Sequence, residues 1–122
     1  KTRRMCIDDT GLGNMLAETM KDKYRSRIEQ ITFTNDNKEH LATQLRTVAE
    51  DRTITLHDDA VTLQQLANTR KTKTATNRDR FDADADETGH IDRMWACALA
   101  VEAGANVAKK RKGSVGTAGC VV

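Results

Sequence analysis

The sequence predicts an α/β domain in which parallel strands are flanked by helices. Short strand-like runs alternate along the chain with amphipathic helical stretches, which is the pattern of strand–helix–strand units. One late stretch rich in Thr, Arg and Lys is instead typical of a hairpin and would add antiparallel strands. The chain has 122 residues, which is the length of one ordinary domain.

The chain opens with a predicted strand, a glycine turn and a helix. An apolar run at 4–8 stops at acidic residues, and Gly11 and Gly13 follow as a tight turn that would bring backbone close to Asp8. Apolar residues then recur every four positions, which predicts an amphipathic helix. These residues are Leu12, Leu16, Met20 and Tyr24, with Met15 beside them.

Two more strand and helix pairs follow. β-branched residues between 28 and 33 predict a second strand, and Asn37 is the expected cap of the next helix. Residues 53–56 alternate like a third short strand, and either Asp58 or Asp59 is the expected cap of the helix after it. The first of these two helices is expected to bury Leu41, Leu45 and Val48, and the second carries Leu63, Leu66 and Ala67.

The last third combines a hairpin, a buried helix and a basic tail. Residues 69–83 predict an exposed hairpin with Asn77 near its tip, followed by an acidic run that lacks the glycine and glutamate of an EF-hand loop. Residues 94–103 are apolar nearly all round, as in a helix buried within a layered fold. We expect one domain over residues 1–108 and a flexible basic tail over 109–122.

Composition excludes several classes of protein. The chain has 20 Lys plus Arg and 18 Asp plus Glu, and this net charge of +2 indicates neither a nucleic-acid nor a membrane partner by itself. No stretch approaches the ~20 apolar residues of a membrane span, and no signal-peptide core is present. Cys6, Cys97 and Cys120 are too widely spaced for a disulfide scaffold or zinc ribbon, and they fit a reducing cytosol. The first residue is Lys1 rather than Met, which suggests a piece of a longer protein.

Two acidic residues stand where chemistry is expected. Asp8 ends the first predicted strand, and functional groups of open α/β sheets gather outside the carboxyl ends of the strands. Asp92 opens the apolar last helix on the same face as Trp95 and Leu99. A carboxylate buried there needs a cation, a salt bridge or a metal. Alternatively, Asp92 pairs with an arginine or caps its own helix.

Two further groups are candidates for the same site. His90 lies two residues before Asp92 and faces the same site only if it precedes the first helical turn, which Gly89 permits; otherwise it is a structural histidine. The hairpin carries a cluster of basic residues that would contact phosphates and hold a nucleic acid near the acids. These residues are Arg70, Lys71, Lys73, Arg78 and Arg80, and an ordinary solvated hairpin is the alternative.

Two motifs resemble one known family. Residues 7–13 (Ile-Asp-Asp-Thr-Gly-Leu-Gly) resemble the Val-Asp-x-Thr-Gly-x-Gly segment in the nuclease domain of tailed-phage terminase large subunits. Residues 89–100 (Gly-His-Ile-Asp-Arg-Met-Trp-Ala-Cys-Ala-Leu-Ala) resemble the Gly-His-x-Asp-Arg-x-Trp-Ala-x-Ala-Leu-Ala segment of the same proteins. The resemblance spans residues 3–103 and is nearest to the Mu-like terminases, and the second motif is the more specific.

The resemblance implies an RNase H-like sheet with flanking helices, truncated here at its N-terminal strands. It also implies an endonuclease that holds two Mg²⁺ or Mn²⁺ ions and cuts double-stranded DNA during packaging of a phage or prophage genome. By position, Asp8 and Asp92 would be metal-binding catalytic acids, and His90 would be a further ligand or proton-handling group. Asp9 falls at a variable position of the motif and is not assigned a role.

The same resemblance implies a setting and partners. The protein would act in the cytoplasm of the bacterial host, with the portal and the small terminase subunit as partners of the full-length protein and with no membrane partner. The family's other metal-binding aspartate precedes the matched stretch, and no P-loop for the packaging motor occurs. The chain is therefore expected to be a C-terminal fragment that is inactive or weak alone.

Two alternatives remain open from the sequence. In the first alternative, the chain is a non-catalytic RNase H-like module that binds DNA or a packaging partner through its hairpin and tail. Alternatively, it would be another RNase H-like enzyme, such as a junction resolvase or an integrase-type nuclease, although residues 89–95 argue against that.

Overall fold

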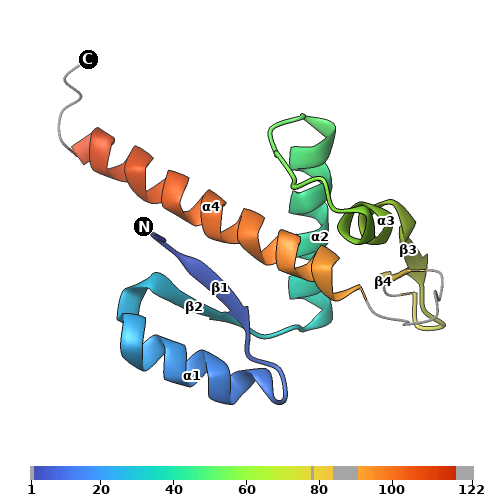
Figure 1. Ribbon diagram of the computed structural model, residues 1–122, viewed down its shortest axis with the longest axis horizontal. Helices are drawn as coiled ribbons and strands as arrows, with labels where there is room; N and C mark the ends of the chain where they lie inside the picture. Colours follow the sequence, from blue (N-terminus) through green and yellow to red (C-terminus); the bar gives the residue numbers. More distant parts are fainter. Residues whose placement is uncertain (1, 78, 84–90, 118–122) are drawn as a thin grey trace.

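The first half of the molecule is built on a parallel strand–helix–strand unit. The computed structural model describes residues 2–77, 79–83 and 91–117. Strand β1 (Met5–Asp8) leads into helix α1 (Gly13–Tyr24), and a short 3₁₀ turn over Arg25–Arg27 leads into β2 (Ile28–Ile31). The two strands are parallel, with Met5 opposite Ile28 and Asp8 opposite Ile31. The parallel pairing expected from the alternation is confirmed (Figure 1).

Glycines make the sharp turn from β1 into α1. Gly11 has φ +61°, a left-handed conformation that side chains larger than hydrogen rarely adopt. A Cβ on Gly13 would collide with the backbone carbonyl of Asp8, so only glycine lets the helix start this close to the strand. The expected approach of backbone to Asp8 is confirmed.

Helix α1 differs from the expected packing. Its apolar residues follow a helical repeat, yet Ala17 is the buried one, whereas Leu12, Met15 and Leu16 are exposed by 95%, 74% and 59%. Periodicity reports that a helix has an apolar face but not which element covers that face. Only the later part of the apolar stripe is covered, since Met20 is half-buried.

Helix α2 (Asn35–Glu50) carries one side of the core. Its N-cap is Thr34, whose Oγ1 accepts a hydrogen bond from the backbone N–H of Asn37 at 3.2 Å. The prediction of Asn37 as the cap was therefore wrong by three positions. Thr34 has the extended backbone that an N-cap requires, while Asn37 lies inside the first turn and donates from its side chain to the Thr32 carbonyl.

The chain between α2 and the next helix contains no strand. Residues 53–56 form a loop, so the predicted third strand was wrong. Arg52 turns the backbone with φ 56°, and Ile54 packs against the core without pairing to a neighbouring strand. Helix α3 (Ala60–Asn68) begins after Asp59, whose carboxylate accepts from the Thr62 backbone N–H at 2.9 Å. Of the two expected caps, Asp59 is the correct one.

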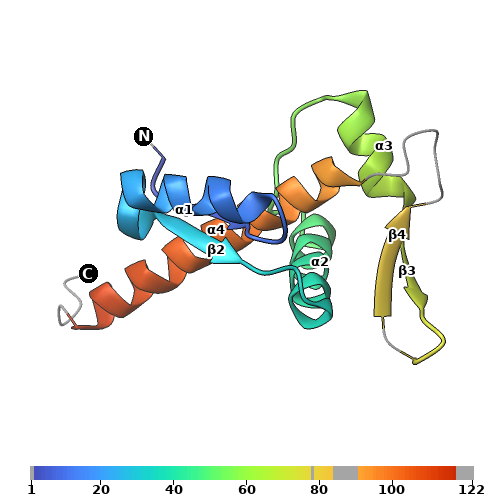
Figure 2. The same cartoon turned by 90° about the horizontal axis from the view of Figure 1, so that it is seen from below.

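The predicted hairpin is present. Strands β3 (Thr69–Lys73) and β4 (Asp79–Ala83) are antiparallel, with Thr69 opposite Ala83. Asn77 takes φ 60° near the tip, as expected for a residue that tolerates left-handed backbone. The hairpin lies beyond α2 at one end of the molecule (Figure 2).

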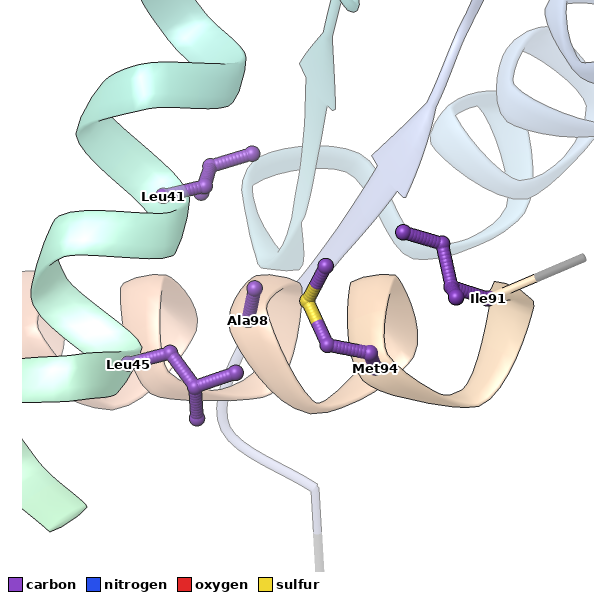
Figure 3. Packing of buried hydrophobic residues seen from close by; sticks show 5 residues of the cluster. All are labelled: Leu41, Leu45, Ile91, Met94 and Ala98. Atoms are coloured by element: carbon purple, nitrogen blue, oxygen red, sulfur yellow. The ribbon is translucent and has the colours of Figure 1, made fainter. Parts of the chain in front are cut away.

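Helix α4 (Asp92–Thr117) is the long element on which both halves pack. It contacts α2 on one side and β1 on the other. The core lies where α2 crosses α4, with side chains from the two helices directed toward one another (Figure 3). Its buried members are Leu41, Leu45, Ile91, Met94 and Ala98.

The extent of α4 differs from the expectation. The helix continues through the basic run to Thr117, where a flexible tail was expected from residue 109. Ala, Lys and Arg in this run are good helix formers and no proline interrupts them, so backbone preference favours continuing the helix. None of the helices in the described ranges is long and apolar enough to cross a membrane.

Candidate metal and DNA site

The first acid of the candidate site is fixed by its own turn. Asp8 is half-buried at the carboxyl end of β1, and its Oδ1 accepts a hydrogen bond from the Thr10 backbone N–H at 2.9 Å. The next backbone N–H, of Asp9, donates to the Ile31 carbonyl at 3.1 Å and extends the pairing with β2 beyond the strand. One carboxylate oxygen of Asp8 therefore holds the loop, and its place at the strand end matches the prediction.

Thr10 ties this loop to the end of β2. Its Oγ1 accepts a hydrogen bond from the backbone N–H of Phe33 at 3.0 Å. The Phe33 ring in turn lies against the Trp95 ring of α4, with centroids 5.2 Å apart. A continuous series of contacts thus leads from Asp8 to the first turns of α4.

The second acid is more exposed than expected. Asp92 is the first residue of α4 and its side chain is exposed, although it shares a helical face with core residues. The first turn of a helix lies at its end, so a residue there can follow the apolar stripe and still reach solvent. The neighbouring Arg93 pairs with Asp59 rather than with Asp92. β1 and α4 pack together, which brings the elements that carry Asp8 and Asp92 side by side.

Helix α3 holds the start of α4 in place. The backbone N–H of Arg93 donates to Oε1 of Gln65 at 3.0 Å, and the Arg93 guanidinium forms an ion pair with Asp59. Gln65 thereby satisfies one of the N–H groups that a helix leaves open at its N-terminus. Sequence reasoning missed Gln65, Arg93 and the pairing role of Asp59, because residues far apart in the chain give no local signal of such contacts.

The donors near this loop are of the kind that magnesium prefers. Carboxylate oxygens suit hard divalent ions, and among the described residues the buried Oδ1 atom of Asp9 has no hydrogen-bond partner. A buried carboxylate oxygen without a partner is costly, so a bound cation beside it would be favourable. In the described ranges no group of three or more His, Cys, Asp or Glu is close enough to hold a metal. His90 and most of the acidic run lie outside the described residues.

One lysine of the predicted basic hairpin is engaged within the protein. Lys71 lies between two carboxylates, 2.7 Å from Asp79 Oδ2 and 3.3 Å from Glu39 Oε1. These hydrogen bonds raise the pKa of Lys71, so it stays charged but is engaged within the protein. Arg70, Lys73 and Arg80 lie on the same two strands, while Arg78 lies outside the described residues.

The surroundings of the two described cysteines favour the neutral thiol. Cys6 is buried, and burial together with the nearby Glu29 carboxylate raises its pKa to about 12. Burial also raises the pKa of the Cys97 thiol. Both are free thiols, Cys6 buried and Cys97 half-buried, and they pack as small apolar residues.

The comparisons with known proteins agree with the motifs. The family model described as a terminase RNase H-like domain matches residues 1–103. A crystal structure of the large terminase nuclease from thermophilic phage G20c with bound magnesium is 26% identical, covers 75% of this chain and 48% of that chain, and gives a TM-score of 0.64. A second crystal structure of that nuclease is 24% identical, covers 81% of this chain and 52% of that chain, and gives a TM-score of 0.65. The search of curated proteins found no match.

These matches confirm the predicted fold class. The chain has an RNase H-like α/β architecture, and it spans about half the length of the solved nucleases that it matches. Its relation to these proteins identifies it as a module of the terminase nuclease type. The chain belongs to the terminase RNase H-like domain family.

Proposed function

We propose that the chain is part of a divalent-metal-dependent endonuclease that cuts double-stranded DNA during phage genome packaging. The observation that carries the proposal is the packing of β1 against α4, because Asp8 ends the one element and Asp92 begins the other. The similarity to a phage nuclease whose crystal structure contains magnesium supports the choice of metal.

Each residue of the site would have its own role in this reaction. When bound, Mg²⁺ or Mn²⁺ ions would supply an activated water and stabilise the leaving oxygen of an in-line phosphodiester hydrolysis. Asp8 and Asp92 would hold the ions, with His90 as a further ligand or proton-handling group. Thr10, by donating its N–H to one oxygen of Asp8, orients that carboxylate and leaves its other oxygen for a ligand.

The activity would belong to a longer protein. Because the chain spans about half of each solved nuclease, we expect it to bind metal weakly and to cut DNA poorly by itself. The full-length protein would work in the cytoplasm of the bacterial host, with double-stranded DNA as substrate and the portal and small terminase subunit as partners.

The test is carboxylate-to-amide substitution in the full-length protein. Asp8→Asn and Asp92→Asn should each abolish metal-dependent DNA cutting, because the amide has the shape of the carboxylate but lacks the charge that binds the ion. ATP hydrolysis by the packaging motor of the full-length protein should stay largely intact. DNA cutting is measured by gel electrophoresis in Mg²⁺ and in Mn²⁺. Asp22→Asn, an exposed acid on α1, is the matched control and should cut normally.

Each contrary outcome has a distinct meaning. Loss of both activities in the Asp8 and Asp92 variants would assign a folding role to these acids. Normal cutting by both variants would favour the alternative, a non-catalytic module that binds DNA or a packaging partner. That alternative also expects substitutions of the hairpin residues to weaken DNA binding and flatten its salt dependence. These residues are Lys71, Lys73, Arg78 and Arg80.

A further inference from the structure

Lys38 is a cation held over two aromatic rings. It lies in the first turn of α2, and its Nζ is 5.7 Å from the centroid of Phe33 and 5.9 Å from the centroid of Trp95. A lysine ammonium within about 6 Å of a ring is attracted by the ring's negative face. Two rings in contact with each other therefore restrict where this long side chain places its charge.

The two rings stand beside the two candidate acids. The backbone N–H of Phe33 is bonded to Thr10, whose own N–H is bonded to Asp8. Trp95 lies three residues after Asp92, a spacing that brings side chains about 5–6 Å apart at Cβ. Because helical side chains lean toward the N-terminus, we expect the Trp95 ring to lie toward the turn that begins with Asp92. The ammonium of Lys38 is thus anchored between the Asp8 loop and the start of α4.

Within the described residues, the charge of Lys38 meets aromatic rings rather than a carboxylate. It has no ion-pair partner in the parts of the chain that the structure describes, whereas Lys71 on the hairpin is held by Glu39 and Asp79. Lys38 is partly buried, so its stem packs while its charged end stays available. A lysine ammonium held beside acidic residues would reduce the repulsion that a polyanion such as DNA meets when it approaches those residues.

We propose that Lys38 binds a non-bridging oxygen of a DNA phosphate next to Asp8 and Asp92. The ammonium would offset the repulsion between the DNA backbone and the two carboxylates and would fix which phosphate lies at the site. This inference rests on the proposed DNA substrate and adds a binding residue that neither motif contains.

The experiment compares three lysine variants of this chain in binding a short duplex of mixed sequence. Binding is measured in Ca²⁺ over a series of salt concentrations. Lys38→Gln should weaken binding by roughly tenfold at low salt and lower the slope of log affinity against log salt by about 1. Lys38→Arg should restore both values. Lys23→Gln is the matched control, because Lys23 also lies over a ring, 5.5 Å from the centroid of Tyr24, but at the far end of α1.

A second signal reports on the site itself. Trp95 is the chain's single tryptophan, so a change in its emission on adding duplex reports contact near Lys38. That change should be reduced in Lys38→Gln and kept in Lys23→Gln. Thermal melts of all three variants show whether lost affinity reflects lost folding.

The outcomes separate the two proposals. If Lys38→Gln and Lys23→Gln lose the same affinity, or if neither loses any, the role of Lys38 is wrong, while the cutting assay on Asp8 and Asp92 still decides the nuclease function. If the wild-type chain binds no duplex, the phosphate site is overturned as well. If the acid variants cut normally while Lys38→Gln loses affinity, the phosphate site stands and the nuclease proposal fails.

Discussion

Asp59 joins two helices through a single carboxylate. It accepts hydrogen bonds from the hydroxyl and the backbone N–H of Thr62, at 2.6 and 2.9 Å, and so caps α3. The same oxygen pairs with Arg93, one residue from Asp92. The Thr62 hydroxyl, the Thr62 N–H and Arg93 together lower the pKa of Asp59 from 3.8 to about 2.

This lowered pKa predicts an acid-dependent loss of stability. Because the folded state favours the ionised form, the contribution of Asp59 is fully present above the unfolded pKa of 3.8 and disappears as pH falls toward about 2. Asp59→Asn should lower Tm by a few degrees at neutral pH and flatten the dependence of Tm on pH between those values. Circular dichroism melts measure both effects.

The adjacent acid provides the control for Asp59. Asp58 is exposed and caps no helix, so Asp58→Asn should leave the melting curve unchanged. An equal loss of Tm in both variants would mean that general surface charge, rather than the cap and the Arg93 pair, accounts for the effect.

At the scale of elements, the crossing of α2 and α4 carries the core. Leu41 is 1% exposed and Met94 is 2% exposed, and they come from opposite sides of this contact. Leu41→Ala should cost about 2–5 kcal/mol, because the cavity that it leaves collapses only in part. Urea unfolding measures this cost as a lower midpoint, with Leu63→Ala as the control because Leu63 is already 42% exposed. Similar midpoints for the two variants would contradict a core centred on this crossing.

The elements show which features a sequence encodes locally. The β1–α1–β2 unit, the Asp59 cap and the Asn77 turn follow from short-range rules, and each was predicted and confirmed. Residues 53–56 alternate like a strand but have no partner in the described sheets, and pairing is a long-range property. For the same reason α1 was predicted as a helix, whereas the exposure of its apolar face was not, because which element covers a helix face depends on long-range packing.

The candidate site likewise has residues that the sequence predicted and long-range contacts that it did not predict. Asp8 and Asp92 were found because each belongs to a contiguous motif, and their roles as metal ligands remain predictions. The contacts that place them, from Gln65 and Asp59 to Arg93 and from Phe33 to Thr10, join residues more than 20 positions apart. Such contacts depend on how α3 and β2 pack, which no motif encodes. The sequence did not predict a role for Lys38 for the same reason.

For the molecule as a whole, apolar residues are distributed unevenly. Large side chains fill the α2–α4 crossing, yet Leu12, Met15 and Leu16 on α1 face outward. Neighbouring exposed apolar side chains form a surface that binds hydrophobic dyes and other apolar groups. The two sets should therefore respond in opposite ways to substitution.

Replacing the exposed pair tests this distribution. The double variant Met15→Gln/Leu16→Gln should change the free energy of unfolding by no more than about 1 kcal/mol, because surface substitutions each stay within about 0.5 kcal/mol. It should also lower the fluorescence of the dye ANS bound to the folded chain. Leu41→Ala should do the reverse, lowering stability without reducing dye binding to the folded state. A large loss of stability in the double variant would mean that α1 is covered in solution, and sedimentation of the wild-type chain at rising concentration would then show whether a second copy covers it.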